Sequence, residues 1–313
     1  MAEPLELAFR AAVAFHRAGD LPEAIRLYLD ILRVAPDLEI AKDNLCLATL
    51  AAGDYERGFR LYDRRFERAL GRVEKPRLPM PEWRGEDIAG ASLLVWPEQG
   101  FGDQIMFARF AVALRRRGVK VTLAAPPQLT RLFESLPLPV VADRGAASAP
   151  RHDYWVMSGS LPGRMGITAQ TLPRDTGLPQ TPWVADGAVG VAWRGRPQHH
   201  NDANRSLADP LGHKLIEATG GRSLHPEDTG ARDFQDTAEI IRGLRLVITV
   251  DTAVAHLAGG LGVPTRILLP SVGVDWRWGV SGDRTPWYDS VTLYRQTSPG
   301  DWTDVLARVT ALL

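Results

Sequence analysis

The sequence predicts an α/β protein with two parallel-sheet halves, preceded by a short all-α segment. Short apolar runs alternate with helical patterns along residues 91–313, which is typical of parallel sheets with right-handed crossovers. Residues 5–70 instead carry an internal repeat of helical pattern. A proline-rich stretch, residues 73–90, separates the two patterns and favours neither helix nor strand.

Composition limits the classes of partner. The chain has 313 residues, enough for two or three domains, and its 37 acidic and 37 basic side chains give no net charge. There is thus no electrostatic case for nucleic acid or an anionic membrane surface. Cys46 is the single cysteine, which excludes an intrachain disulfide and fits a reducing compartment. With neither a signal-peptide pattern nor an apolar run of roughly 20 residues, we expect a soluble, cytoplasmic protein.

The all-α segment, residues 1–72, repeats with a period of 34 residues. Three residues recur at this spacing: Gly19, Asp20 and Tyr28 return as Gly53, Asp54 and Tyr62. The period, with Gly-Asp between two helical patterns, resembles the tetratricopeptide repeat. An antiparallel four-helix bundle is the alternative.

Two such repeats are few for a free-standing array, which normally needs about three. We therefore expect the helices to pack on the domain that follows. Recognition of a protein partner and plain scaffolding both remain open as roles for them.

The first α/β half is predicted at residues 91–183. Its expected strands and helices are, in order, strand 92–96, a helix through 105–114, strand 119–124, helix 128–136, strand 139–142 and strand 153–157.

The second half is predicted at residues 184–313. Its expected elements are strand 189–193, helix 211–218, strand 222–224, helix 236–244, strand 246–250, helix 253–260, strand 265–269 and helix 302–313. Two such halves form two Rossmann-like domains that face each other across a cleft, with ligands at the carboxyl ends of the strands.

A strand-to-helix corner in the second half is the first candidate site. The strand 246–250 is apolar throughout, Asp251 and Thr252 form a turn, and small residues from Ala253 begin a helix. A helix that starts there leaves backbone N–H groups and a partial positive charge at the sheet edge, which suits a phosphate. The alternative is an ordinary turn in which Asp251 or Thr252 caps the helix.

A glycine loop in the first half is the second candidate. Gly100 and Gly102 follow the strand 92–96 and permit close approach of a ligand to the backbone. Ile105 stands where a dinucleotide fingerprint needs a third glycine, so that motif is absent. Asp103 is either a carboxylate base or a helix cap.

A polar loop after the strand 189–193 is the third candidate. Arg205 and Ser206 end this loop, and Arg194 and Arg196 lie near its start. Arginine suits bidentate phosphate contact, although a solvated loop is the alternative. The adjacent histidines at 199 and 200 have no carboxylate at metal-ligand spacing, so we expect no metal.

Four motifs in this order resemble the glycosyltransferases related to bacterial ADP-heptose heptosyltransferases. They are WPEQGFGDQ at 96–104, the loop from Trp193 with NDANRS at 201–206, DTAEII at 236–241, and VDTAVAHLAGGLGVP at 250–264. The closer likeness is to proteins in which tetratricopeptide repeats precede such a domain. The segments 270–279 and 285–288 also look familial.

This resemblance implies a GT-B architecture, with the first half as acceptor domain and the second as nucleotide-sugar donor domain. By position, Asp103 matches the proposed general base, and Arg205 with Ser206 the second phosphate-contacting loop. The donor-binding motif is matched by Asp251, Thr252, Ala253 and His256. The implied activity is an inverting, metal-independent sugar transfer of hexosyl- or heptosyltransferase type, without a cofactor. Its implied partners are a nucleotide-sugar donor and a protein or saccharide acceptor.

Departures from the family pattern keep two other function classes open. Ala253 replaces the glycine usual in the heptosyltransferase motif, and both halves are short. A binding or scaffold protein that keeps the fold without turnover is one alternative, and an epimerase-like nucleotide-sugar enzyme is the other. Trp276, Trp278 and Trp287 could stack on a ligand, although packing in the core is the preferred interpretation.

Overall fold

The computed structural model describes residues 3–68, 73–182, 187–199 and 201–311. The chain forms two compact units. The repeat unit comprises Met1–Lys75, Pro162–Leu172 and Val272–Gly282, and the two-sheet unit comprises Pro76–Leu161, Pro173–Ser271 and Asp283–Leu313. The predicted domain boundaries at 72–73 and 183–184 involve residues outside those described, and they remain predictions.

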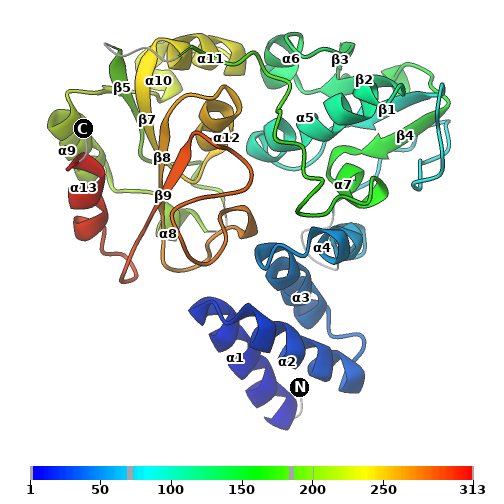
Figure 1. Ribbon diagram of the computed structural model, residues 1–313, viewed down its shortest axis with the longest axis horizontal. Coiled ribbons are helices and arrows are strands. Elements are labelled where there is room, and N and C mark those ends of the chain that lie inside the picture. The colour runs from blue at the N-terminus through cyan, green and yellow to red at the C-terminus, as the bar shows by residue number, and fades with distance from the viewer. Residues whose placement is uncertain (1–2, 69–72, 183–186, 200, 312–313) are drawn as a thin grey trace. The chain divides into compact units, whose positions relative to one another are not determined.

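Four helices form most of the repeat unit (Figure 1). They are α1 (Glu3–Ala18), α2 (Leu21–Val34), α3 (Glu39–Ala51) and α4 (Tyr55–Tyr62), followed by the 3₁₀ turn η1 (Asp63–Phe66). Consecutive helices pack on each other. Both repeats turn at the predicted glycines, because Gly19 and Gly53 have φ of +84° and +79°. The tetratricopeptide assignment itself stays a prediction.

The two later segments of the repeat unit pack on its helices. Arg164 forms an ion pair with Asp63, and the Trp276 ring contacts the Phe59 ring edge-on at 5.8 Å. The expected packing of the repeats on later residues therefore involves one segment within the first predicted half, residues 162–172, and one segment after the strand at 265–269. The sequence patterns did not single out residues 162–172 for this role.

The first sheet of the two-sheet unit has four parallel strands in the order β3-β2-β1-β4. The strands are β1 (Ser92–Trp96), β2 (Lys120–Ala125), β3 (Val140–Ala142) and β4 (Tyr154–Met157). Its helices are α5 (Phe101–Arg116), α6 (Pro127–Phe133) and the start of α7 (Leu161–Arg164), with 3₁₀ turns η2 (Ala146–Ser148) and η3 (Ser158–Ser160). Helix α6 ends at Phe133, three residues before the predicted position 136, and Pro137 disfavours a helical conformation at Leu136 itself.

The second sheet has five parallel strands in the order β6-β5-β7-β8-β9. The strands are β5 (Ala188–Ala192), β6 (Arg222–Ser223), β7 (Leu244–Val250), β8 (Thr265–Leu269) and β9 (Val291–Arg295). Strand β9 was not predicted: it is a short edge strand whose apolar residues alternate with polar ones. The helices are α8 (Asp202–Arg205), α9 (Asp209–Thr219), α10 (Pro226–Thr229), α11 (Phe234–Arg242), α12 (Ala253–Gly260) and α13 (Thr303–Thr310), with the 3₁₀ turn η4 (Trp276–Trp278) belonging to the repeat unit.

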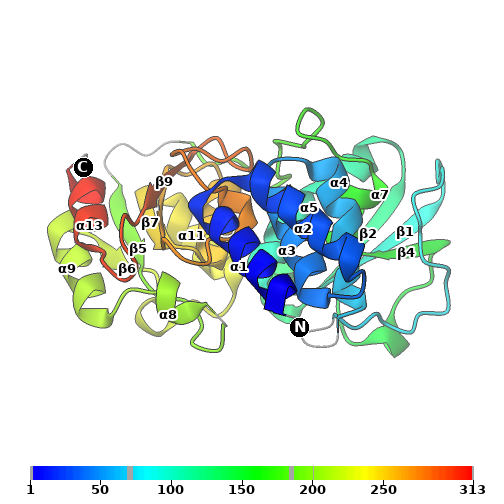
Figure 2. The ribbon, with the colours of Figure 1, turned by 90° about the horizontal axis from the view of Figure 1, so that it is seen from below.

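Helices cover both faces of this second sheet. Helices α9 and α13 lie on one face, and α11 and α12 lie on the other (Figures 1 and 2). On the first face, Val191 and Ile248 pack with Leu215 and Val305 in one buried cluster. The predicted mixed α/β class with parallel sheets is thus confirmed, and β7, buried along most of its length, is the central strand.

Each sheet has one point at which the strand order reverses. In the first sheet it lies between β1 and β4, and in the second between β5 and β7. Loops leave such a pair of strands in opposite directions, so a crevice opens at their carboxyl ends. The glycine loop follows β1, the polar loop follows β5, and the Asp251 turn follows β7, so all three candidate motifs lie at these two points. No helix among the described residues is both long and apolar enough to cross a membrane.

Candidate functional site

The polar loop and the Asp251 turn meet at the switch point of the second sheet. Arg205 is 9% exposed, and its Nη1 donates to the Asp251 carbonyl oxygen at 2.7 Å. The guanidinium passes so close to Gly195 that a Cβ atom there would lie 2.5 Å from Nη2. Ser206 accepts from the Gly195 N–H at 2.9 Å and donates to Asp202 at 2.9 Å. The structure thus brings Arg205 to the Asp251 turn, with Ser206 next to it in the same loop.

Helix α12 begins without a side-chain cap. Thr252 occupies the N-cap position in an extended conformation, but its hydroxyl pairs with Thr249 at 3.3 Å instead of a helix N–H. The first turn contains no acidic residue. Within the described residues, the N–H groups of 252–254 find no acceptor. Thr252 is thus the N-cap residue, as in the alternative of an ordinary turn, but its side chain leaves these donors open to an anion.

The β1–α5 corner is closed by its own carboxylate. Asp103, which is half-buried, accepts from the Gly100 N–H at 3.0 Å; this is one half of a capping box, because the N-cap residue Gly100 has no side chain to form the other half. Gln99 has φ of +62° and is the only non-glycine residue with positive φ among those described. Asp103 thus lies at the helix start as predicted. Its bond to the Gly100 N–H is that of a helix cap, which was the alternative to a catalytic base. Its predicted role as a base stays a prediction.

Glu98 is a buried residue of this corner that the sequence patterns did not single out. It is 6% exposed, and its Oε1 accepts from the Gly159 N–H at 2.7 Å. This hydrogen bond joins the loop after β1 to the turn after β4, across the switch point of the first sheet. A carboxylate directly after an apolar strand and a proline was the available signal.

Helices α5 and α12 bring the two corners together. A Cβ atom on Gly102 would lie 2.7 Å from the imidazole Cδ2 of His256 and 3.3 Å from the Ala253 Cα. The first turns of the two helices are thus in direct contact, and only glycine fits at 102. The glycine loop and the strand-turn-helix motif, about 150 residues apart in sequence, form one site.

The edge of the His256 ring that faces away from Gly102 contacts Tyr288. His256 is 6% exposed, and its Nδ1 lies 2.9 Å from the Tyr288 hydroxyl. The Arg109 guanidinium lies 4.8 Å from the centre of the Tyr288 ring. Arg109 itself is fully buried and donates to the carbonyl oxygens of Trp287 at 2.9 Å and Pro173 at 3.1 Å. Tyr288 belongs to the segment 285–288 noted above, but no sequence pattern linked it to His256, and none distinguished Arg109 from core residues.

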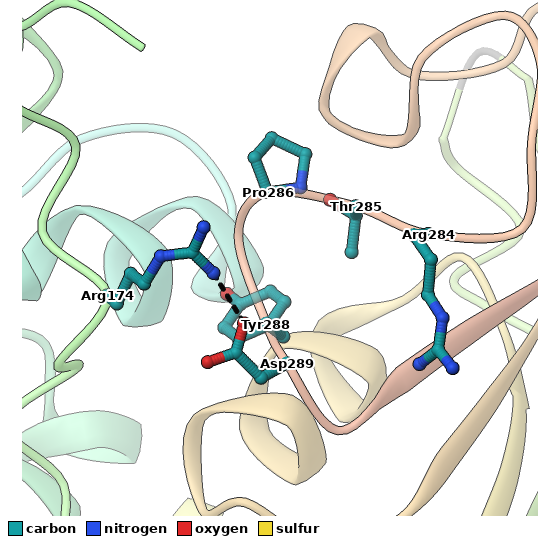
Figure 3. A pocket seen from close by; sticks show the side chains of 6 residues that line it. All are labelled: Arg174, Arg284, Thr285, Pro286, Tyr288 and Asp289. Carbon is teal, nitrogen blue, oxygen red and sulfur yellow. Dashed lines mark hydrogen bonds and ion pairs between the residues drawn. The ribbon is translucent and has the colours of Figure 1, made fainter. Parts of the chain in front are cut away.

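An open cavity of about 440 Å³ lies beside Tyr288 (Figure 3). Five of its lining residues lie in the segment before β9, and the sixth is Arg174: the set is Arg174, Arg284, Thr285, Pro286, Tyr288 and Asp289. Arg174 and Asp289 form an exposed ion pair at 2.6 Å across it. Tyr288 is the residue that connects this cavity to His256. Trp287, 1% exposed, is buried as the packing interpretation predicted, as are Trp276 and Trp278 in the repeat unit.

Trp193, at the start of the polar loop after β5, packs against His225 after β6. Their rings meet edge-on at 4.2 Å, and Trp193 Nε1 donates to Asp209 at 2.8 Å. Burial lowers the pKa of His225, and the nearby Arg194 lowers it further. The Nδ1 of His199 accepts from a backbone N–H, and position 200 lies outside the described residues. In the described part of the chain, no three His, Cys, Asp or Glu side chains are grouped to hold a metal ion.

Comparison with known proteins gives one curated relative. No protein-family model matches the chain. Protein FlbA of Caulobacter vibrioides is 27% identical over 333 residues, covering 88% of this chain and 55% of FlbA. The chain therefore spans about half the length of this relative.

Solved structures are similar at a lower level. The E. coli heptosyltransferase WaaC with ADP aligns with a TM-score of 0.48 and 12% identity over 71% of this chain and 98% of WaaC. A glycosyltransferase of family 9 from Veillonella parvula aligns with a TM-score of 0.45 and 11% identity over 72% of this chain and 92% of that protein. Similarity at this level assigns neither a family nor an activity to the chain.

Proposed function

We propose that the chain is an inverting, metal-independent glycosyltransferase that moves a sugar from a nucleotide-sugar donor to a hydroxyl group. One observation carries the proposal: the N-terminus of α12, with backbone donors that have no acceptor in the described chain, meets Arg205 and the glycine loop of α5. Two phosphate groups of a nucleotide need such a set of fixed donors. Three of the four motifs that resemble heptosyltransferase-related enzymes supply these same residues.

The chemistry follows from the charges at the two corners. Asp103 would take the proton of the acceptor hydroxyl as its oxygen attacks the anomeric carbon. The bond from that carbon to the diphosphate breaks on the opposite face, so the configuration inverts. The N–H groups at 252–254 and the Arg205 cation would stabilise the negative charge that develops on the leaving diphosphate. These donors can perform the task that a metal ion performs elsewhere.

A second candidate is a binding or scaffold protein that keeps the site without turnover. The hydrogen bond from the Gly100 N–H to Asp103 favours it, because a carboxylate that caps its own helix is a weaker base. Arg205 likewise donates to the Asp251 carbonyl group, which an incoming phosphate must compete with. Partner recognition through the helical repeats would then be the main function.

A thermal-shift screen tests the proposal first. The purified chain is melted with UDP, GDP, ADP, CMP and dTDP, without added metal. A ligand at 100 times its dissociation constant adds about 2.7 kcal/mol to the free energy of unfolding. One clear rise in the melting midpoint would identify the donor nucleotide and justify an acceptor search among proteins and saccharides. No rise for any of the five would favour the scaffold candidate. In a separate incubation with a nucleotide sugar and no acceptor, product formed from the donor alone would indicate an epimerase.

The cellular setting is part of the same proposal. We place the reaction in the cytoplasm, with a protein or saccharide acceptor and with the repeats as a surface for a protein partner. Fractionation of cells, followed by detection of the chain, tests this location directly.

A further inference from the structure

A chain of three side chains leads from a buried cation to the candidate site. Arg109 lies under the ring of Tyr288, and the Tyr288 hydroxyl lies 2.9 Å from Nδ1 of His256. The opposite edge of the imidazole faces the glycine loop, because a Cβ atom on Gly102 would lie 2.7 Å from Cδ2 and 3.5 Å from Nε2. We propose that Tyr288 is a positioning residue that fixes His256 as the neutral tautomer with its proton on Nε2.

The direction of the hydrogen bond follows from the charge under the ring. A guanidinium 4.8 Å from the ring centre withdraws electron density from the phenol. The hydroxyl then donates more strongly and accepts more weakly, so it donates to Nδ1. When Nδ1 accepts, the single proton of the neutral imidazole resides on Nε2.

The neighbourhood also favours the neutral form of His256. The imidazole is 6% exposed, and its hydrogen-bonded partner sits on a fully buried cation. Burial and a nearby positive charge both disfavour protonation of an imidazole. Asp103, the residue after Gly102, is the carboxylate on the α5 side of the imidazole, and the hydrogen bond from Tyr288 leaves Nε2 as the nitrogen that carries the proton of the neutral ring.

The position of the His256 Nε2–H group suggests that it contacts the diphosphate of a bound nucleotide. This inference rests on the proposed glycosyltransferase function. Nε2 lies near Gly102, in the first turn of α5, where α5 contacts the start of α12. With its proton on Nε2, His256 would donate to the diphosphate when the nucleotide binds, in addition to the N–H groups at 252–254. Tyr288 also lines the open cavity beside Arg174 and Asp289 (Figure 3).

Nitrogen NMR on the free chain tests the tautomer without any nucleotide. The chain, with its seven histidines labelled at both ring nitrogens, is compared with Tyr288→Phe, and His256→Gln identifies the resonances. We expect the protonated-type signal on Nε2 in the unaltered chain and a mixture of tautomers in Tyr288→Phe. Tyr294→Phe is the matched control, since Tyr294 is also buried, at 8% exposure, and lies in a separate core cluster. A proton on Nδ1, or an unchanged tautomer in Tyr288→Phe, would overturn the proposal.

Nucleotide binding provides the second readout. With the nucleotide that gives the largest thermal shift, Tyr288→Phe should lower affinity roughly threefold to tenfold, the effect of one hydrogen bond, whereas Tyr294→Phe should leave it unchanged. Equal affinities for the two variants would remove His256 from the anion site. If no nucleotide binds while the tautomer responds to Tyr288→Phe, the glycosyltransferase proposal fails and the positioning of His256 by Tyr288 stands.

Discussion

The two strand-to-helix corners of the two-sheet unit have the same architecture and opposite chemistry. After β1, the start of α5 is filled by the chain itself: Asp103 accepts from Gly100, and Glu98 accepts from Gly159. After β7, the start of α12 has no carboxylate in its first turn and no side-chain cap; Asp251 lies before the helix, and Asp202 is paired with Arg205 at 3.2 Å. The first corner holds its carboxylate at the helix start itself, and the second presents helix N–H donors without acceptors in the described chain.

This difference assigns complementary tasks to the two corners. A corner that holds a carboxylate repels phosphate and can accept a proton, whereas a corner of unfilled N–H groups attracts phosphate. The contact between Gly102 and His256 holds the two within one site. An acceptor hydroxyl and a leaving diphosphate need this pair of environments side by side.

The largest expected effect comes from removing the charge at the first corner. Asp103→Asn keeps an oxygen that can cap α5 but cannot take a proton, so transfer should fall by roughly 10²–10⁴ while nucleotide affinity stays nearly intact. Activity and binding are measured on the same preparation. Asp54→Asn is the control, because Asp54 also caps a helix, by accepting from the Arg57 N–H. Full activity in Asp103→Asn would reduce Asp103 to a cap.

The next effect concerns the cation at the second corner. Arg205→Ala should weaken nucleoside diphosphate binding by roughly 1.5–3 kcal/mol, the range for hydrogen bonds to charged groups. Isothermal titration measures the affinity. Arg222→Ala, at an exposed position, serves as the matched control. An affinity equal to that of the control would exclude Arg205 from the site.

A smaller effect is expected from making the second corner resemble the first. Thr252→Asp places a carboxylate at the N-cap of α12, where it should accept from the free N–H groups. The free energy of unfolding should rise by roughly 0.5–1 kcal/mol, as measured by denaturant titration, while nucleotide affinity falls. Thr252→Ser is the control, because it keeps a neutral hydroxyl. If Thr252→Asp bound nucleotide as tightly as Thr252→Ser, phosphate would not lie at this helix.

The same contrast explains what the sequence could predict. Apolar runs and small residues determine local structure, so the strand 246–250 and the helix 253–260 were predicted to within two residues. The gathering of Arg205 with Asp251 was predictable too, because both follow strand ends and parallel strands end at one edge.

Other features depend on contacts that no local pattern records. Tyr288 reaches His256 across 32 positions, and Arg109 reaches the Trp287 carbonyl group across 178. Strand β9 forms by pairing with β8, and its five residues alone resemble many loops. The close approach of Gly102 to His256 likewise requires both helices to be in place.

The smallest expected effect is the pH dependence of the free energy of unfolding that His225 contributes, next to the edge strand β6 of the second sheet. The pKa of His225 is lowered from its ordinary value of 6.5 by burial, so the unfolded chain binds a proton at this residue more readily than the folded chain. The free energy of unfolding should therefore fall as the pH drops below about 6.5, and His225→Gln should reduce that fall. Denaturant titrations at pH 7.5 and 5.5 measure it. Burial also lowers the pKa of His16, in the repeat unit, so this residue contributes to the fall in the same direction. The stability loss of His16→Gln between the two pH values is therefore compared with that of His225→Gln. If His225→Gln lost as much stability between the two pH values as the unaltered chain, the ring beside Trp193 would not be buried as a neutral base.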